Sequence, residues 1–375
     1  MNIIYICHEY PPFKTGGIGI YTKEIAENLS NKGHGVYVIG IYDQENKSIE
    51  KINNVNIIRL PSSKNKILKK VINRCKLYVF LKIFIKKTKI DIIETPDFQG
   101  WLAFFPKLKC KYLIRLHGSV TYFYELLKIK SYKKLIWKYI EKNALKKADK
   151  IISVSNFTAQ ETKKIFNIKN SIDVIHNGIE INNKYIEKHP QNNMKKFVFA
   201  GSLIKKKGII ELVDAWKIFS ENKIDVELHI FGKDTEGLLS LFLIDESLKI
   251  GDNLFFHGAV EKNKLIEFYK SAHFFISPSK AEAFSLAPME AMASSLLVIY
   301  NNQTSATELI THNENGYLLS NLNNLNIAKT LEIVYALTDH EYNSITKASY
   351  LTVKDKFNVE NLTNKNTSMY INLIK

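Results

Sequence analysis

Short apolar runs alternate with longer stretches of mixed hydrophobic and polar residues along the chain. In the first half, apolar runs of strand length span residues 2–7, 36–40, 90–94, 112–116 and 150–154. In the second half, similar runs span residues 197–201, 227–232, 253–258 and 273–277. Helical spacing of apolar positions follows several of these runs, as in residues 18–31. The alternation predicts an α/β protein with parallel sheets.

The length of the chain favours two such units. With 375 residues, the chain is long enough for two domains that each bury a core. We expect the first domain to span residues 1–185 and the second to span residues 192–356, with a polar segment rich in Asn and Lys at 181–194 between them. Because ligands of parallel sheets bind beyond the carboxyl ends of the strands, the loops that follow the strands are the candidate sites.

Positive charge is concentrated in the first half. Residues 1–190 contain 34 Lys or Arg and 16 Asp or Glu, a net charge of +18, whereas residues 191–375 have a net charge of −2. Residues 64–90 contain ten basic residues and no acid, with apolar residues partly at helical spacing. Residues 128–150 contain nine Lys and two acids. These segments predict basic amphipathic helices that bind an anionic membrane surface.

Two other interpretations of the basic segments remain open. They could be core helices with a solvated basic rim, and the charge alone could attract nucleic acid or another polyanion. No recognised nucleic-acid motif accompanies the charge, so we expect no nucleic-acid partner.

The three cysteines, Cys7, Cys75 and Cys110, are odd in number and follow no metal-ligand spacing. They favour a reducing compartment over disulfide bonds or a zinc site. The first residues enter a strand without a basic leader, and no apolar run has membrane-spanning length. We therefore expect a cytoplasmic protein that associates peripherally with the inner face of the membrane.

Two acids bracket a loop of small residues in the second half. Glu282 and Glu290 flank this loop, and Pro288 lies where we expect a helix over residues 288–293 to begin. Loop N–H groups and a helix N-terminus form a site for an anion such as a diphosphate. A carboxylate beside such a site suits sugar hydroxyls, which donate hydrogen bonds to it. The alternative is a pair of ordinary surface acids.

The residues around these acids resemble the E-x7-E motif of retaining glycosyltransferases of family 4. Residues 282–286 read Glu-Ala-Phe-Ser-Leu, with Ala283 where members usually have Gly. Residues 307–310 and 315–318 resemble two further motifs of the family. The Gly and Pro that usually follow the helix are missing from residues 295–299.

The first half contains further residues that resemble this family. Gly16 and Gly17 follow the first strand and resemble its opening glycine loop, although their spacing is not that of a dinucleotide-binding fingerprint. We expect the two glycines to allow a backbone path closed to other residues and to bring N–H groups close to a ligand. His117, with Gly118, resembles the histidine that lies beside the transferred sugar.

A lysine-rich loop after residue 201 resembles the family pattern G-R-L-x-x-x-K-G. Lys207 aligns with the lysine of that pattern, whereas Ser202 stands where members have Arg. Lys205 or Lys206 could supply the second positive charge, but Lys lacks the bidentate fork of Arg.

The resemblance implies a GT-B fold, in which two Rossmann-like domains face each other across a cleft and a C-terminal helix, here 357–375, packs back on the first domain. It implies a nucleotide-diphosphate sugar as donor and no requirement for a metal or other cofactor. It assigns catalysis to His117, Lys207 and Glu282. It assigns donor binding to Gly16, Gly17, Ser202, Lys206, Lys207, Phe284, Ser285, Leu286 and Glu290.

The function expected from this resemblance is transfer of a hexose-type sugar, with retention, to a glycan or lipid-linked acceptor in surface polysaccharide or glycolipid assembly. Three alternatives stay open. A non-catalytic sugar-nucleotide-binding homologue is favoured by Ser202 and Ala283, and a polyanion- or membrane-binding protein by the charge of the first half. A sugar-nucleotide epimerase of similar architecture fits the motifs less well.

Overall fold

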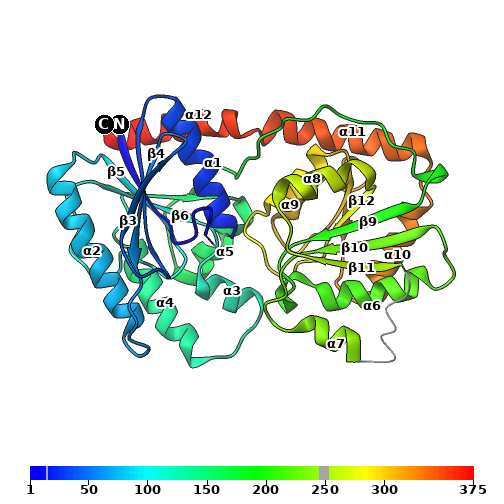
Figure 1. Cartoon of the computed structure of the whole chain (residues 1–375), viewed down its shortest axis with the longest axis horizontal. Helices are drawn as coiled ribbons and strands as arrows, with labels where there is room; N and C mark the ends of the chain where they lie inside the picture. The colour runs from blue at the N-terminus through cyan, green and yellow to red at the C-terminus, as the bar shows by residue number, and fades with distance from the viewer. Residues whose placement is uncertain (14–15, 245–252) are drawn as a thin grey trace. The chain divides into compact units, whose positions relative to one another are not determined.

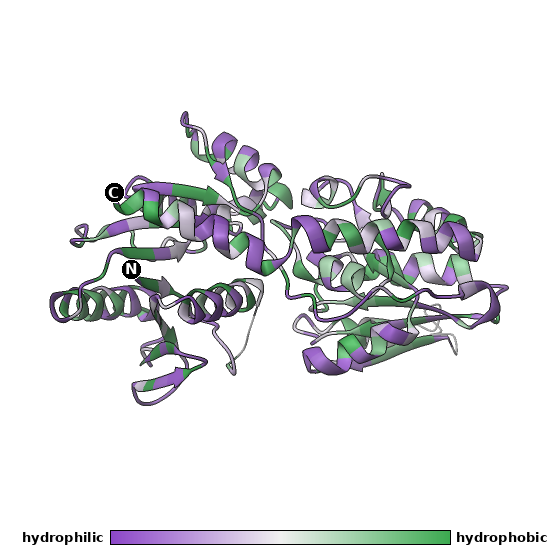
Figure 2. Ribbon diagram, turned by 90° about the horizontal axis from the view of Figure 1, so that it is seen from above, coloured by the Kyte–Doolittle hydropathy of each residue, from purple (hydrophilic) through white to green (hydrophobic). Residues whose placement is uncertain are grey.

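The chain folds into two compact units. The computed structural model describes residues 1–13, 16–244 and 253–375, with the side chains of residues 241, 243 and 244 left out. One unit comprises Met1–Gly178 together with Val359–Lys375, and the other comprises Ile179–Asn358 (Figure 1). Hydrophobic residues alternate with hydrophilic ones along the helices of both units, as expected for helices that cover sheets (Figure 2).

Over residues 1–13 and 16–178, the first unit forms an eight-stranded sheet in the order β3-β4-β2-β1-β5-β6-β7-β8. Neighbouring strands are parallel except for the antiparallel pair β3 and β4. The strands are β1 (Asn2–Ile6), β2 (Gly35–Tyr42), β3 (Ser48–Ile52), β4 (Val55–Pro61), β5 (Ile92–Pro96), β6 (Lys111–Leu116), β7 (Lys150–Ser153) and β8 (Asp173–Val174). The helices are α1 (Gly17–Asn31), α2 (Lys69–Lys87), α3 (Val120–Leu126), α4 (Tyr132–Leu145), α5 (Asn156–Phe166) and, from the end of the chain, α12 (Val359–Ile374).

Alternate side chains of β1 bury opposite faces of this sheet. Ile3 and Tyr5 pack in the cluster that includes residues of α1 and α12. Ile4 and Ile6 pack in the cluster that includes residues of α2. The continuous apolar run of this strand is therefore the signature of a strand with both faces covered.

The basic segment at 64–90 forms α2, but apolar and polar residues are not cleanly separated around it. Leu77 and Leu81 are buried against the sheet. Val71, Val79 and Ile83 are exposed, each more than half, on the solvent side. The expectation of a simple amphipathic helix is therefore wrong in this detail, because the outward side carries hydrophobic residues as well as lysines.

Over residues 179–244 and 253–358, the second unit forms a six-stranded parallel sheet in the order β11-β10-β9-β12-β13-β14. The strands are β9 (Lys195–Ala200), β10 (Val226–Phe231), β11 (Leu254–Gly258), β12 (Phe274–Ser277), β13 (Leu297–Asn301) and β14 (Tyr317–Leu319). The α-helices are α6 (Ile209–Ser220), α7 (Leu238–Ile244), α8 (Lys262–Ser271), α9 (Leu286–Ala293), α10 (Asn324–Tyr335) and α11 (Asp339–Lys356). This strand order is that of a Rossmann fold.

The core of the second unit lies mainly between its sheet and helices α6 and α10. Phe197, Leu228 and Phe274 from three strands pack with Trp216 of α6 and Leu331 of α10. The rings of Phe197 and Phe274 are stacked, with centroids 4.4 Å apart. These buried aromatic residues fix the positions of β9 and β12 relative to each other, and the loops after both strands carry site residues.

The segment predicted as a linker packs with the second unit. The structure divides the chain after Gly178, whereas the sequence placed the end of the first domain at residue 185. Lys188, in this segment, donates hydrogen bonds to the carbonyl oxygens of Tyr269 and Ala272 at 2.7 and 2.6 Å. Burial lowers the pKa of Lys188 to about 7. Buried polar contacts of this kind attach the segment to the second unit.

The C-terminal residues return to the first unit. The sequence placed a single helix at 357–375, and the structure has α12 over Val359–Ile374. Asn366 and Tyr370 of this helix are buried in the first unit. No helix within the described residues is long and apolar enough to cross a membrane.

Candidate active site

Both sheets place functional loops at a topological switch point. In the second unit, β9 and β12 are neighbours, but the connections that follow them lead to opposite edges of the sheet. In the first unit, β1 and β5 have the same relationship. Ligands of open parallel sheets bind beyond the carboxyl ends of such strands. The predicted residues of the second unit follow β9 and β12, and Gly16 and Gly17 follow β1.

A glycine brings the two loops of the second unit together. Gly208 lies between the short helical turn Lys205–Lys207 and α6, with a φ of +72°. A β-carbon added at Gly208 would lie 2.1 Å from the carbonyl oxygen of Pro278, the residue after β12. Both the left-handed conformation and the close approach therefore require glycine here. The approach fixes the lysine-rich turn against the start of the loop that contains Glu282.

Lys207 and Glu282 form an ion pair between these loops. The Nζ of Lys207 lies 2.5 Å from the Oε1 of Glu282. Burial alone would raise the pKa of Glu282, but the charges of Lys207 and Lys206 outweigh it, so the pKa is lowered. Glu282 is therefore a carboxylate at neutral pH. Two lysine side chains thus act on one carboxylate at the switch point, an arrangement that suits an anion.

Lys206, not Lys205, is the second cation of this cluster. Burial lowers the pKa of Lys206, while Glu282 acts in the opposite direction. Lys205 is exposed, and its backbone N–H donates to Glu236 at 2.9 Å. Ser202, which stands where relatives of the predicted family have Arg, is also exposed. Of the two lysines that the sequence left open, Lys206 is the one that acts on Glu282 beside Lys207.

The helix after Glu282 begins two residues earlier than expected. Helix α9 starts at Leu286, with Ser285 as its N-cap, so Pro288 occupies the third helical position instead of the first. Proline is tolerated there because the first N–H groups of a helix have no partner within it. Phe284 is buried against Phe357, with ring centroids 5.5 Å apart. This contact anchors the loop that leads into the first turn of α9.

Glu290 lies one turn into α9 and faces a different partner from Glu282. Its Oε1 lies 3.0 Å from the Nζ of Lys262 at the start of α8. The Glu290 side chain is 12% exposed, so a ligand could reach it. The two predicted acids therefore have separate environments within one unit.

The glycine loop of the first unit differs from the prediction. Gly16 has an extended backbone with a φ of −114°, and a β-carbon at Gly17 would meet nothing within 4 Å. The expectation that both glycines follow a path closed to other residues is wrong. A β-carbon at Gly16 would lie 2.9 Å from a side-chain oxygen of Glu9, which can move, whereas one at Gly19 would lie 2.1 Å from the Glu9 backbone oxygen, so the stricter requirement is at Gly19. Lys14 and Thr15 of the same motif lie outside the described residues.

Carboxylates of the chain itself occupy helix starts in the first unit. The Glu9 Oε1 accepts the N–H of Gly19 in α1 at 2.8 Å. Glu141 accepts the N–H groups of Val120 and Thr121 at the start of α3, at 2.8 and 3.1 Å. These acids use N–H groups that a phosphate would otherwise bind. The lysine cluster that suits a diphosphate lies in the second unit.

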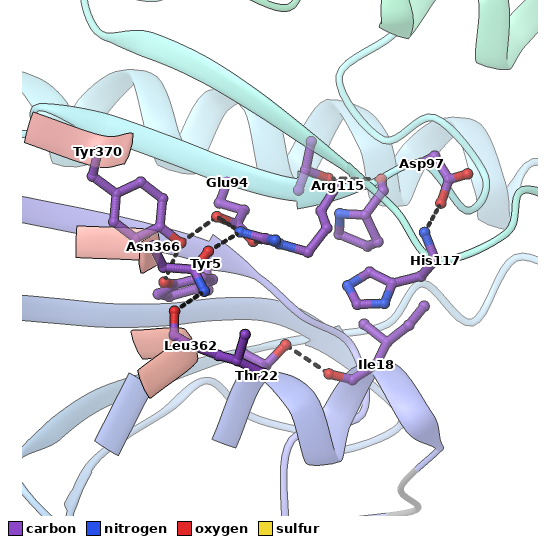
Figure 3. A network of polar contacts seen from close by, with 12 residues as sticks. Tyr5, Ile18, Thr22, Glu94, Asp97, Arg115, His117, Leu362, Asn366 and Tyr370 are labelled. Atoms are coloured by element: carbon purple, nitrogen blue, oxygen red, sulfur yellow. Dashed lines mark hydrogen bonds and ion pairs between the residues drawn. The ribbon is translucent and has the colours of Figure 1, made fainter. Parts of the chain in front are cut away.

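His117 follows β6 and packs against α1. Its ring centroid lies 4.8 Å from that of Tyr21. Its backbone N–H donates to the Oδ1 of Asp97 at 2.9 Å, as Figure 3 shows. Burial, reinforced by the charge of Arg115, lowers the pKa of His117 to about 3. The imidazole is therefore neutral at physiological pH and can donate or accept a hydrogen bond without carrying charge.

Asp97 is a polar residue of this region that sequence reasoning missed. It follows β5 at the switch point of the first unit and is 3% exposed. Its Oδ2 has no hydrogen-bond partner. Burial raises the pKa of Asp97 well above its ordinary value. Its position after the apolar strand, at the carboxyl end, was the available signal.

A buried ion-pair network lies behind His117 (Figure 3). The Nε of Arg115 donates to the Oε1 of Glu94 at 2.6 Å. Its Nη2 donates to the Oδ1 of Asn366 in α12 at 2.7 Å. The hydroxyl of Tyr370, also in α12, donates to the Oε2 of Glu94 at 2.5 Å. This network connects the C-terminal helix to the strands that lead to Asp97 and His117.

The predicted residues thus form two groups, one in each unit. Lys206, Lys207 and Glu282 meet in the second unit, where Phe284, Ser285, Leu286 and Glu290 follow on the same loop and helix. His117 lies against α1, which follows Gly16 and begins at Gly17, in the first unit. Within the described residues, no group of three or more His, Cys, Asp or Glu side chains is placed to hold a metal ion.

Two family models match successive parts of the chain. The model described as glycosyltransferase family 4 matches residues 15–183. The model described as glycosyl transferases group 1 matches residues 182–350. Together they cover the parts of both units that contain the predicted residues.

Relatives match over different lengths. An uncharacterized glycosyltransferase of Methanocaldococcus jannaschii is 27% identical over 394 aligned residues, covering 99% of this chain and 98% of the relative. The O-antigen chain mannosyltransferase RfbU of Salmonella typhimurium is 27% identical over 189 residues, covering 50% of this chain and 51% of the relative.

Solved structures share the fold over nearly the whole chain. A sucrose-phosphate synthase from Thermosynechococcus elongatus has a TM-score of 0.83 at 20% identity, covering 99% of this chain and 98% of the other. Anabaena HepE in complex with UDP-glucose has a TM-score of 0.76 at 16% identity, covering 99% of this chain and 100% of the other. The two family models show the family and the solved structures show the fold: this chain belongs to the glycosyltransferases of the family 4 type, with the GT-B fold of two Rossmann-like domains.

Proposed function

We propose that this chain transfers a hexose-type sugar from a nucleotide-diphosphate sugar to a glycan or lipid-linked acceptor, with retention at the anomeric carbon. The observation that carries the proposal is the cluster of Lys206, Lys207 and Glu282 at the switch point of the second unit. Two lysines beside the loop that leads into α9 suit a diphosphate, and a carboxylate beside them suits sugar hydroxyls. The UDP-glucose bound to Anabaena HepE supports this class of donor.

Each predicted residue has a role in this reaction. Lys207 and Lys206, with the backbone N–H groups over residues 284–286, stabilise the negative charge that grows on the departing diphosphate. Ser202, in the same turn, contributes donor contacts without a charge. Glu290 binds the ribose hydroxyls, and Glu282 binds hydroxyls of the transferred sugar.

His117 positions the transferred sugar through a neutral imidazole. The bond between the anomeric carbon and the diphosphate oxygen breaks, and the acceptor oxygen forms its bond to the same face of that carbon. The acceptor proton passes to the departing diphosphate oxygen. Because lysines and N–H groups supply the stabilising charge, we propose that the reaction requires no metal or other cofactor.

We place this reaction in the cytoplasm, in surface polysaccharide or glycolipid assembly. The three cysteines are free, as in proteins of a reducing compartment. The mannosyltransferase RfbU, named for the O-antigen chain, supports an acceptor in surface polysaccharide assembly.

The test is a transfer assay with the purified chain, UDP-, GDP- and ADP-sugars, and lipid-linked and soluble glycan acceptors, with and without EDTA. We expect one donor to give a product whose anomeric configuration, determined by NMR, equals that of the donor. A product with the opposite configuration contradicts retention. Donor binding without hydrolysis or transfer favours the non-catalytic homologue, and activity lost in EDTA and restored by a divalent cation contradicts the metal-free proposal.

A further inference from the structure

Large hydrophobic side chains gather on the outer sides of α2 and α4. On α4, Tyr132, Leu135 and Tyr139 are 72, 70 and 68% exposed. Before and within α2, Ile67 and Val71 are 91 and 58% exposed. Exposed apolar side chains that cluster in this way mark an interaction site, whereas single ones are ordinary surface. The α2–α4 surface is defined by Ile67, Lys70, Val71, Phe104, Lys133, Leu135, Ile136, Tyr132 and Tyr139.

A groove runs through the α2–α4 surface and is lined by residues of both helices. Its volume is about 640 Å³. Val71 and Cys75 of α2 line one wall, and Ile136 and Trp137 of α4 line the other, with Phe104 between them. The lining is predominantly apolar, so the groove suits a hydrocarbon chain more than a polar ligand.

The groove is held by defined contacts. The Nη1 of Arg74 donates to the carbonyl oxygen of Gly100 at 2.6 Å, which fixes this side chain of α2 against the loop after β5. The Nζ of Lys70 lies 4.7 Å from the ring centroid of Trp137, a cation–π distance. Lys70 and Lys133 thus place positive charge along the lining of the groove.

Acids pair with some of the lysines beside this surface, as Asp43 does with Lys69 at 3.0 Å and Glu45 with Lys64 at 3.6 Å. Residues 64–90 contain ten basic residues and no acid. Glu141 of α4 points inward and binds the start of α3. Glu125 pairs with Lys134 at 2.8 Å, and Asp149 pairs with Lys107 at 2.5 Å. Within the described residues, no ion pair is formed by Lys70 or Lys133, so the surface combines exposed hydrophobic residues with positive charge.

This combination favours one kind of partner. A second copy of the chain docked through the same surface would oppose like charges, which costs free energy. Nucleic acid is bound mainly through its phosphates and would leave Leu135 and Ile136 exposed to water. An anionic bilayer satisfies both features, because lysines meet the headgroups while apolar and aromatic side chains enter the interface.

We propose that the α2–α4 surface docks on an anionic lipid bilayer, with Leu135 and Tyr139 in the headgroup region and a lipid chain in the groove. The proposal deepens the proposed function, since a lipid-linked acceptor lies in such a bilayer. It explains why the hydrophobic residues of α2 and α4 face outward. It also assigns the positive charge of the first half to a defined surface.

The test is flotation of the purified chain with vesicles of phosphatidylcholine alone and of phosphatidylcholine mixed with phosphatidylglycerol. The wild type is expected to float with the anionic vesicles and to detach as salt is raised. The variant Leu135→Ser/Tyr139→Ser removes two exposed apolar groups, and Lys70→Glu/Lys133→Glu reverses two charges that line the groove. Each is expected to lower the partition coefficient about tenfold or more, because each buried apolar group and each lysine contributes to interfacial binding.

A matched control is Ile224→Ser/Leu325→Ser, which changes two side chains that are 96 and 67% exposed in the second unit. It is expected to bind vesicles like the wild type. No binding to anionic vesicles, or equal binding of the wild type and both α2–α4 variants, overturns the proposal. The proposal is also overturned if the wild type binds single-stranded nucleic acid or dimerises in solution, and these variants abolish that property while vesicle binding stays unchanged. The shift in melting temperature that a nucleotide induces is measured for every variant. If the shift is retained while vesicle binding is lost, docking has failed but the proposed donor site has not.

Discussion

The Nζ of Lys207 lies 2.5 Å from the Oε1 of Glu282, so an ion pair joins the loop after β9 to the loop after β12. The two residues are 75 positions apart in the chain and meet at the switch point of the second sheet. A donor whose diphosphate binds Lys207 must compete with Glu282 or bind beside it. In the proposed reaction, Lys207 provides a cation for the leaving group and Glu282 a carboxylate for the transferred sugar.

Removing the Lys207 charge is expected to slow transfer far more than it weakens folding. In Lys207→Met, kcat/KM should fall by about 10²- to 10³-fold, the range seen when one stabilising donor of a growing oxyanion is lost. Steady-state transfer assays measure this loss. Lys205→Met, in the same turn but exposed, is the matched control and should stay close to the wild type. Similar losses in both variants would remove Lys207 from its specific role.

Gly208→Ala is expected to destabilise the second unit and to displace the lysine-rich turn. The substitution combines a left-handed backbone with a β-carbon 2.1 Å from the Pro278 oxygen. The left-handed conformation alone costs about 1–2 kcal/mol for a residue other than glycine. Gly237→Ala is a matched control, because Gly237 has the same φ of +72° and nothing within 4 Å of the added carbon. Equal losses of melting temperature in the two variants would show that the contact with Pro278 is unimportant.

Glu290→Gln is expected to weaken nucleotide binding through the ribose. Hydrogen bonds to a charged group contribute about 1.5–3 kcal/mol, so the affinity should fall about 10- to 100-fold. Calorimetry with the preferred nucleoside diphosphate and its 2′,3′-dideoxy analogue measures the effect. Lys262→Met removes the partner of Glu290 and should not weaken binding of the ribose compound. A loss of equal size for the dideoxy analogue would contradict the ribose assignment.

Buried histidines are expected to make the fold sensitive to mild acid. Burial lowers the pKa of His8 and His117 to about 3 and that of His273 to about 4. The unfolded chain binds protons at these groups near pH 6.5, and the folded chain does not. Their stabilising contribution is therefore complete above pH 6.5 and is lost as the pH falls towards the folded values.

The melting temperature should accordingly fall between pH 7 and pH 5, before most carboxylates titrate. His273→Gln should reduce this fall, because Gln does not take up a proton in this range. Gln can still accept the hydrogen bond of the Lys196 N–H that His273 Nδ1 accepts at 3.2 Å. A melting temperature that stays constant over this range, at constant ionic strength, would show that these histidines are not buried as neutral groups. The pH profile of the transfer rate should show no inflection near pH 6.5 from His117, because its pKa in the folded chain is about 3.

Local patterns were enough to place most strands and the main helices. The apolar runs at 2–7, 112–116 and 273–277 correspond to β1, β6 and β12, because strands covered on both faces leave a continuous signal. The loops after β9 and β12 could be singled out because their residues resemble a known family. Element ends were less accurate, as with α9, since the first turn of a helix lacks internal hydrogen bonds.

Contacts between distant residues could not be predicted. Arg115 meets Asn366 across 251 positions, and nothing near either residue indicates the other. The partner of Lys207 was equally hidden, although both members of the pair had been singled out separately. The steric role expected of Gly16 and Gly17 lies at Gly19, because the backbone of Glu9, not the local sequence, determines which position has no room for a side chain.

Titration of the purified chain with UDP, GDP and ADP, followed by thermal unfolding, tests the central claim most directly. A ligand that binds only the folded state raises the melting temperature by mass action. We predict that one of the three diphosphates stabilises the wild type, and that Lys207→Met and Glu290→Gln both lose this shift while Lys264→Ala, on the exposed start of α8, retains it. If no diphosphate stabilises the wild type, or if both site variants keep the full shift, the second unit does not hold a nucleotide donor at β9 and β12.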